Sequence, residues 1–433
     1  MSTFIDRLPQ PAYNRHDRLS GRVTEKLVRR QGARNMHISR RDFLKLAGMT
    51  LLGTRCLPAS MPSGGQSDWR GLLPDYERCA RDNIVQVDGR RALLASHLYP
   101  CTYIRDALFW GPLAFGDSQL GLECYDWFAQ SQLPNGQIRS AVALHPDQEH
   151  LCIPTDDEGT LLFVIASGWL GLHGHALNPE RIVAAYGWVQ AHVRDHFYVS
   201  APGPFRYWAD TVNPEISESI AHNQGLLCLA RRSMARMGLG QVTESDVVIA
   251  QERYRSFYDA RRGYLTLGKH SKFARAQDVS AVFPEFLSRF LYNEPILSDA
   301  MVLAHVKRLV GNAAVSTNRR RLAGIKVISS STGAFLPPAW FHEPALNPRG
   351  DYHNGGYWPM YTIVALALAD AISERKTYEP VIGQLVYNEL SQDHQSKEVI
   401  RLTPGAVGSF DALRCNYTWN ALISAACRWA GLV

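Results

Sequence analysis

Two acidic side chains, one of which stands beside aromatic residues, could carry out acid–base chemistry in this 433-residue chain. Asp210 follows Trp208 in the segment 206–211, and Glu398 lies far downstream in the segment 397–400. Trp and Tyr beside an acid raise a carboxyl pKa, so that the group stays protonated and can act as a general acid. We therefore predict Asp210 as a general acid and Glu398 as a second carboxylate that activates water. Asp411 is the alternative to Glu398, and a surface location is the alternative for both.

Two further acidic motifs stand at expected helix starts. Tyr103-Ile104-Arg105-Asp106 combines a guanidinium fork with a carboxylate, a pair that can hydrogen-bond to vicinal sugar hydroxyls; a structural ion pair is the alternative. Asp157 lies in an acidic run, 156–158, before an apolar helix. We predict that Asp157 faces a cleft and binds hydroxyls, although acids at a helix start also suit the helix dipole without any ligand.

Aromatic and polar residues alternate in two other segments, 351–359 and 416–421. Flat rings can stack on sugar rings while His and Asn contact the sugar edges. The expected substrate contacts from all these segments are Tyr103, Arg105, Asp106, Asp157, Trp208, His353, Asn354, Trp358 and Trp419.

Helical periodicity runs through almost the whole chain. Apolar residues recur at three- and four-residue steps in 75–87, 103–131 (divided near Gly116), 157–172, 179–197, 216–236, 243–258, 280–291, 297–310, 356–372, 377–390 and 417–431. Every second connection is long and rich in Gly, Pro and aromatic residues: 132–156, 198–215, 262–279, 311–355 and 391–416. About twelve helices with this alternation predict an all-α fold, an (α/α)6 barrel whose long loops form a cleft at one end. An irregular α-solenoid is the alternative, but no repeat of about 34 to 47 residues occurs. Short strands are expected only near 264–267 and 325–329.

The eight cysteines contain no Cys-x-x-Cys pair and no zinc-finger spacing with histidine. We therefore expect no metal and no other cofactor. Most of the cysteines are expected to be small core residues. A disulfide is compatible with an oxidising compartment, but the sequence leaves its pairing open.

The N-terminal region differs in charge and motif from the rest. Ser39-Arg40-Arg41-Asp42-Phe43-Leu44-Lys45, followed by a short apolar run, resembles a twin-arginine export signal. The run is too short to span a bilayer, which takes about 20 apolar residues, so we expect no stable membrane insertion. Residues 1–60 hold twelve Lys and Arg against four acids, a net +8, and the +6 of the whole chain leaves −2 for residues 61–433.

This division predicts an N-terminal extension with signal peptide over 1–60 and a single barrel domain over 61–433. The mature part lacks the basic excess of a nucleic-acid-binding protein. The expected location is the periplasm or the extracellular space, and the expected partners are the twin-arginine translocase during export and a carbohydrate substrate.

Taken in order, five motifs resemble those of the glycoside hydrolases built on the (α/α)6 barrel, such as glucoamylases, trehalases and amylo-alpha-1,6-glucosidases. They are "YIRD", "DDEG", "FYDARRGYL", "DYHNGGYWP" and "NYTWNA", which together span about residues 75–430. The resemblance implies hydrolysis of a glycosidic bond with inversion, by an acid and a base about 6.5–9.5 Å apart. By position, Asp210 matches the acid and Glu398 the base, although "YWADT" around Asp210 is not tied to one family.

Two other functions stay open on the same barrel, because fold does not determine function. One is a non-catalytic carbohydrate-binding protein. The other is a sugar lyase or epimerase, in which Tyr352 and His353 would transfer protons.

Overall fold

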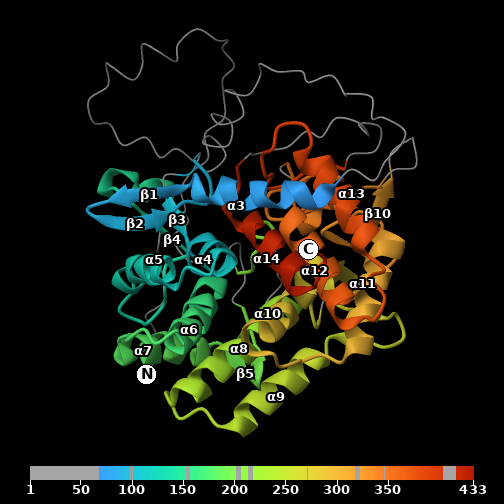
Figure 1. The fold of residues 1–433 in the computed structure, drawn as a ribbon. Coiled ribbons are helices and arrows are strands. Elements are labelled where there is room, and N and C mark those ends of the chain that lie inside the picture. The colour runs from blue at the N-terminus through green and yellow to red at the C-terminus, as the bar shows by residue number, and fades with distance from the viewer. Residues whose placement is uncertain are drawn as a thin grey trace, which may run out of the picture.

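The computed structural model describes residues 68–433 except for 98, 100, 153–156, 201–205, 213–217, 271, 317–321, 346 and 403–415. The twin-arginine segment, Asp411 and the basic triplet 319–321 lie outside the described residues. In the described part the chain folds into twelve α-helices joined by loops and short strands (Figure 1).

The helices alternate along the chain between an outer and an inner ring. The outer helices are α3 (Leu73–Arg81), α5 (Ser118–Gln130), α7 (Pro179–Ala191), α9 (Glu244–Arg255), α11 (Asp299–Ala313) and α13 (Glu379–Leu390). The inner helices are α4 (Gly111–Phe115), which continues the π-helical segment η2 (Arg105–Trp110), α6 (Asp157–Leu172), α8 (Ala221–Met237), α10 (Phe283–Tyr292), α12 (Pro359–Ile372) and α14 (Ala421–Trp429). From α6 onward each inner helix contacts the next, α14 contacts α4, and η2, which continues into α4, contacts α6, so the ring closes. This arrangement confirms the predicted (α/α)6 barrel.

The apolar character of the inner helices explains their position. Every residue of α6 from Asp157 to Leu170 is buried, as is every residue of α12 from Pro359 to Asp370. A helix that is apolar on all sides must be surrounded by protein, whereas α3 buries only one side, through Leu73, Tyr76, Cys79 and Ala80. The core therefore lies between and inside the two rings.

All the long loops lie at one end of the barrel, where they lead into the inner helices. The chain passes from an inner to an outer helix in a few residues, for example 238–243 between α8 and α9. It returns from an outer to an inner helix through long segments, such as 314–358 between α11 and α12. The long loops therefore all lead into the N-terminal ends of inner helices, where the helix dipole favours negative charge.

Six antiparallel pairs of short strands lie within the described connections. They are β1 (Ile84–Val87) with β2 (Arg90–Leu93), β3 (Cys101–Tyr103) with β4 (Ala141–Ala143), β5 (Val193–Arg194) with β6 (Phe197–Tyr198), β7 (Tyr258–Asp259) with β8 (Tyr264–Leu265), β9 (Ala276–Asp278) with β12 (Ile328–Ser330), and β10 (Ala314–Ser316) with β11 (Leu322–Ile325). The strands expected near 264–267 and 325–329 are present in this set.

Three helix predictions were wrong in their bounds. The helix predicted over 179–197 ends at Ala191, because residues 193–198 form the hairpin β5–β6. The helix predicted over 75–87 ends at Arg81, because residues 84–87 form the hairpin β1–β2. Its turn is Asp88-Gly89, where both residues have positive φ, a hairpin signal that the apolar periodicity obscured. The helix predicted to begin at 103 begins as a π-helical turn after the strand β3.

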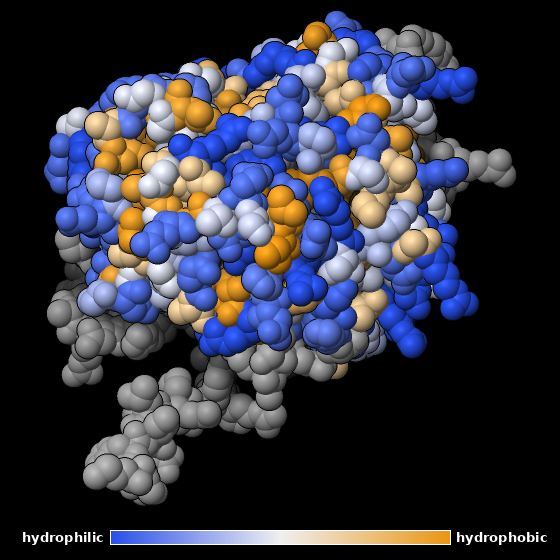
Figure 2. Space-filling model, turned by 90° about the horizontal axis from the view of Figure 1, so that it is seen from below, coloured by the Kyte–Doolittle hydropathy of each residue, from blue (hydrophilic) through white to orange (hydrophobic). Residues whose placement is uncertain are grey.

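Among the residues that the structure describes, few large apolar side chains are exposed. Figure 2 shows one face on which apolar residues are scattered in small groups among polar ones. No helix within the described ranges is long and apolar enough to cross a membrane.

Candidate active site

A pocket lies where the long loops meet the inner ring. It encloses about 400 Å³ of empty space, part of which is open to solvent. Its walls are formed by Tyr99, Tyr103, Arg105, Asp106, Trp208, Asp210, Tyr352, His353, Trp358, Glu398, Tyr417 and Trp419. These residues come from the segments before or at the start of four inner helices, η2 with α4, α8, α12 and α14.

Nine of the eleven side chains that the sequence singled out therefore lie in one pocket, among them both predicted catalytic carboxylates. The other two lie elsewhere. Asp157 is buried and pairs with Arg206, at 3.1 Å between Oδ1 and Nη1. Asn354 hydrogen-bonds to the backbone N–H and C=O of Leu336 and to the C=O of Asn347. Both side chains connect loops to the scaffold, which is the structural alternative to hydroxyl binding.

Buried hydrogen bonds hold the segment that carries Asp210. The indole Nε1 of Trp208 donates to the Ser280 hydroxyl at 2.6 Å, and that hydroxyl donates to Asp278 at 2.6 Å. The phenol of Tyr207 also donates to Asp278. Burial raises the pKa of Asp278, and the hydroxyl donors lower it. Asp210 therefore follows two aromatic rings whose polar ends are anchored in the core.

His353 lies beside Asp210 and is oriented by two polar residues. Its Nδ1 is 2.7 Å from the Thr211 hydroxyl and 3.8 Å from Oδ1 of Asp210. Because the Thr211 hydroxyl donates to Oδ1 of Asn347 at 3.1 Å, it accepts a hydrogen bond from Nδ1–H of His353. The ring stacks on Trp358 with centroids 4.9 Å apart. The His353 ring is therefore oriented by a hydrogen bond at its Nδ1 edge and by stacking of its face on Trp358.

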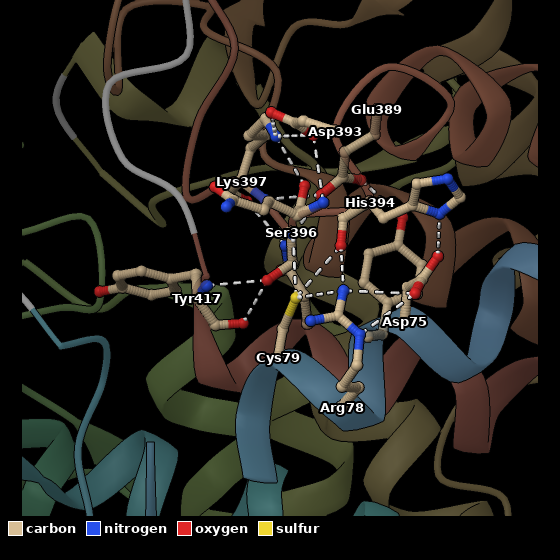
Figure 3. Close-up of polar contacts among 12 residues, drawn as sticks. Asp75, Arg78, Cys79, Glu389, Asp393, His394, Ser396, Lys397 and Tyr417 are labelled. Atoms are coloured by element: carbon tan, nitrogen blue, oxygen red, sulfur yellow. Dashed lines mark hydrogen bonds and ion pairs between the residues drawn. The ribbon is translucent and has the colours of Figure 1, made fainter. Parts of the chain in front are cut away.

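The segment that carries Glu398 is anchored on both sides. Before it, the Ser396 hydroxyl accepts from the backbone N–H of Tyr417 at 2.7 Å and donates to its C=O at 2.9 Å (Figure 3). After it, Ile400 and Tyr357 exchange two backbone hydrogen bonds of 2.8 Å. Glu398 is thus held between the loop of Tyr417, which also lines the pocket, and the start of α12.

A row of charges reaches from the pocket into the core. Nε of Arg105 lies 2.6 Å from Oε2 of Glu158, and Oε1 of Glu158 lies 2.9 Å from Nε2 of His222. Desolvation opposes the charge on Glu158, but Arg105 and His222 outweigh it and lower the pKa of this carboxyl. The Arg105 guanidinium is therefore pre-positioned by a buried carboxylate, an ion pair that the sequence did not identify.

Asp106 is a buried carboxyl of the pocket. Burial raises its pKa to about 7, against the lowering effects of Arg105 and of a hydrogen bond from the Trp419 backbone. Its Oδ1 is buried and has no hydrogen-bond partner among the described residues. A buried acceptor without a partner is costly, and a ligand hydroxyl at this oxygen would remove the cost.

Aromatic rings form the remainder of the pocket. Trp208 meets Trp358 at a centroid distance of 5.1 Å, and Trp358 meets Trp419 at 5.6 Å. Tyr99 contacts the rings of Tyr103 and Tyr417, at 5.4 and 6.2 Å. Such rings give a sugar flat apolar faces, while the polar groups between them contact its hydroxyls.

Three aromatic wall residues, Tyr99, Tyr352 and Tyr417, were not among the expected contacts. Tyr352 has a φ of +40°, a left-handed conformation that is costly for an aromatic residue and concentrates at functional sites. The sequence signal that could have found all three is a tyrosine in a long loop just before an inner helix.

The comparisons with known proteins agree with the fold. No protein-family model matches the chain, and no curated protein matches its sequence. Among solved structures, a glycosidase variant in complex with glucose is similar with a TM-score of 0.55 and 14% identity, over 86% of this chain and 100% of that one. A bacterial glucoamylase complexed with acarbose is similar with a TM-score of 0.54 and 11% identity, over 84% of this chain and 56% of that one. The GH63 mannosylglycerate hydrolase from Thermus thermophilus in complex with glucose is similar with a TM-score of 0.51 and 12% identity, over 84% of this chain and 100% of that one. At such identities the likeness shows that the chain has the fold of the (α/α)6-barrel glycosidases.

Proposed function

We propose that this protein is a glycoside hydrolase that cleaves a glycosidic bond of an oligo- or polysaccharide with inversion. One observation carries the proposal: Asp210 and Glu398, which come from different loops, line the same aromatic pocket as Arg105 and Asp106. The glycosidase fold of its structural neighbours supports the same reaction class.

The proposed chemistry divides between the two carboxyl groups. Asp210 protonates the oxygen of the leaving group, and Glu398 activates a water molecule for attack from the opposite face of the sugar. Arg105, whose guanidinium is held by Glu158, and Asp106, with its unpartnered buried oxygen, bind hydroxyls of the sugar. The surrounding Trp and Tyr rings exclude water from the sugar faces and orient the bond to be cleaved.

The test is a glycan panel treated with residues 61–433, with products identified by mass and by the anomeric configuration released first. We expect hydrolysis with inversion, and a loss of at least about 100-fold in kcat for Asp210→Asn and Glu398→Gln, the scale of general acid–base catalysis. Asp299→Asn, on the outer helix α11, is the control and should keep full activity. Wild-type activity in Asp210→Asn would remove that residue from the mechanism.

A lyase or epimerase is the second candidate, because Tyr352 and His353 also line the pocket. The same product analysis distinguishes it: an unsaturated sugar or an epimer replaces the hydrolysis product. Glycan binding without any product would indicate a carbohydrate-binding protein instead.

We also propose export by the twin-arginine route. The disulfide between Cys101 and Cys152 supports the proposal, because disulfides persist mainly in oxidising compartments. Replacing Arg40 and Arg41 with lysine should leave the protein inside the cell, as measured by fractionation with an antibody. Unchanged export of that variant would exclude the route.

A further inference from the structure

The backbone just before Glu398 is bound by a buried carboxyl group on an outer helix. Oε1 of Glu389, at the end of α13, accepts the backbone N–H of Lys397 at 2.8 Å (Figure 3). Nδ2 of Asn420 donates to the Lys397 C=O at 2.7 Å and to the same Glu389 oxygen at 3.1 Å. Both polar groups of Lys397's backbone are therefore occupied, and the backbone direction into Glu398 is determined.

Glu389 itself is held from the other side. The phenol of Tyr76 on α3 donates to its Oε2 at 2.6 Å. Glu389 is 3% exposed, and burial raises the pKa of its carboxyl to about 7. Burial of an ionisable group is expensive, and here three donors, the Lys397 N–H, the Asn420 amide and the Tyr76 hydroxyl, offset the cost. The ammonium of Lys397 pairs with Asp393 at 2.7 Å, so the same residue has one contact through its backbone and another through its side chain.

The far side of Glu398 is fixed by the backbone pair of Ile400 and Tyr357. Glu398 thus lies in a short span between two anchors. Loss of the Glu389 carboxyl removes the acceptor of the Lys397 N–H from one of them and leaves the bonds of Ser396 and Asn420, which loosens that end. A displacement of about 1 Å at a reacting group can cost about 100-fold in rate, whereas binding of the sugar depends on the other pocket walls.

We propose that Glu389 is a positioning residue for Glu398: by holding the peptide of Lys397 it aims the Glu398 carboxylate at its reaction partner. The inference rests on the proposed function and adds to it a group outside the pocket. A purely structural role for Glu389, as a link between α3, α13 and α14, is the alternative that the experiment must separate.

Two substitutions separate these roles. Glu389→Gln keeps a carbonyl oxygen for the Lys397 N–H, and its amide can donate to the phenol oxygen of Tyr76, which reverses that hydrogen bond. Glu389→Met fills similar space without any acceptor. Asp393→Asn is the matched control, because it disturbs the side chain of the same lysine and leaves its backbone contact intact. If the Met variant does not fold, Glu389→Asp replaces it, because the shorter side chain withdraws the acceptor by one methylene.

Kinetics and hydrogen exchange are measured at a temperature where every variant is folded, as judged by circular dichroism. We expect Glu389→Met to lose at least about tenfold in kcat with KM changed less than about threefold, while Glu389→Gln and Asp393→Asn stay within about threefold of wild type. Exchange measured by mass spectrometry should rise in the Met variant in the peptide around Lys397 and stay unchanged in peptides of the other inner helices.

Three results overturn the inference. The first is a folded Met variant with wild-type kcat, and the second is a Gln variant that loses as much kcat as the Met variant. The third is unchanged exchange around Lys397. If the wild type itself hydrolyses no glycan, the proposed function fails, and exchange alone then decides whether Glu389 anchors this segment.

Discussion

The imidazole of His222 lies 2.9 Å from the carboxylate of Glu158, and both side chains are fully buried. Nδ1 of the same ring lies 3.1 Å from the carbonyl oxygen of Ser280, which can only accept, so Nδ1 carries a proton. The lowered pKa of Glu158 keeps this carboxylate ionised. Glu158 is therefore a buried anion that lies between the Arg105 guanidinium and the His222 ring.

Neutralising that anion should destabilise the protein. Glu158→Gln removes the buried counter-charge of Arg105, and we expect a loss of about 3–5 kcal/mol in the free energy of unfolding. Urea denaturation measures it. Glu294→Gln is the control, because Glu294 pairs with Arg232 and Arg236 while 42% exposed, and it should cost less than about 1 kcal/mol. Equal losses in both variants would contradict the buried charge row.

Asp106→Asn should stabilise the protein at high pH. The folded-state pKa of about 7 lies above the ordinary value of 3.8, so unfolding releases a proton between these pH values. In the wild type, the contribution of Asp106 to the free energy of unfolding is fully present below about pH 4 and is lost as the pH rises through 7. The loss is at most about 1.4 kcal/mol per pH unit. The Asp106→Asn variant does not titrate at this position, so its unfolding free energy relative to wild type should increase between about pH 4 and 7. Its affinity for sugar should be lower than that of the wild type.

A second substitution, Asp246→Asn, should change the pH dependence of the unfolding free energy in the opposite direction. Asp246, which caps α9 with Thr243, has a lowered pKa because of its hydrogen bonds to that residue. Its contribution is present above its unfolded pKa and is lost as pH falls through the folded pKa. Asp246→Asn should therefore become less stable relative to wild type as pH rises, opposite to Asp106→Asn. Curves of the same sign for both variants would contradict the assignments.

Reduction of the Cys101–Cys152 disulfide should lower stability. The bond joins β3, which carries Tyr103, to a residue 51 positions later. Loop-closure entropy for that separation predicts a loss of about 4 kcal/mol in the unfolding free energy. The double variant Cys101→Ser, Cys152→Ser should show the same loss and no response to reductant. A non-reducing peptide map without the linked fragment would show that the bond does not form.

Two glycines of α6 should respond differently to alanine. A Cβ at Gly168 would lie 2.6 Å from the Cβ of Ser233 on α8, so the two inner helices would have to separate. Gly168→Ala should cost about 1–3 kcal/mol. A Cβ at Gly171 meets nothing within 4 Å, and Gly171→Ala should stabilise by up to about 1 kcal/mol through helix propensity. Thermal unfolding of both variants checks the inner-ring contact.

Much of the fold was predictable because helices reveal themselves locally. The continuous apolar run of α6 and the Gly-rich, aromatic loops before α12 and α14 are visible in the chain itself. In a closed ring of helix pairs, the long loops of an alternating series lie at one end. The alternation therefore predicts that Asp210, His353 and Glu398, which stand in long loops, lie close together. The hairpin β1–β2 was missed because its turn signal lies beside a helical apolar pattern.

By itself, the sequence determined the helical period, the alternation of short and long connections, and the segments whose aromatic and acidic residues approach one another. Only the tertiary structure decided that Asp157 pairs with Arg206, that Cys101 bonds to Cys152, and that Glu389 holds the backbone before Glu398. The physical reason is that periodicity is a property of neighbouring residues, whereas the partner of a buried polar group is selected by packing between segments that are distant along the chain.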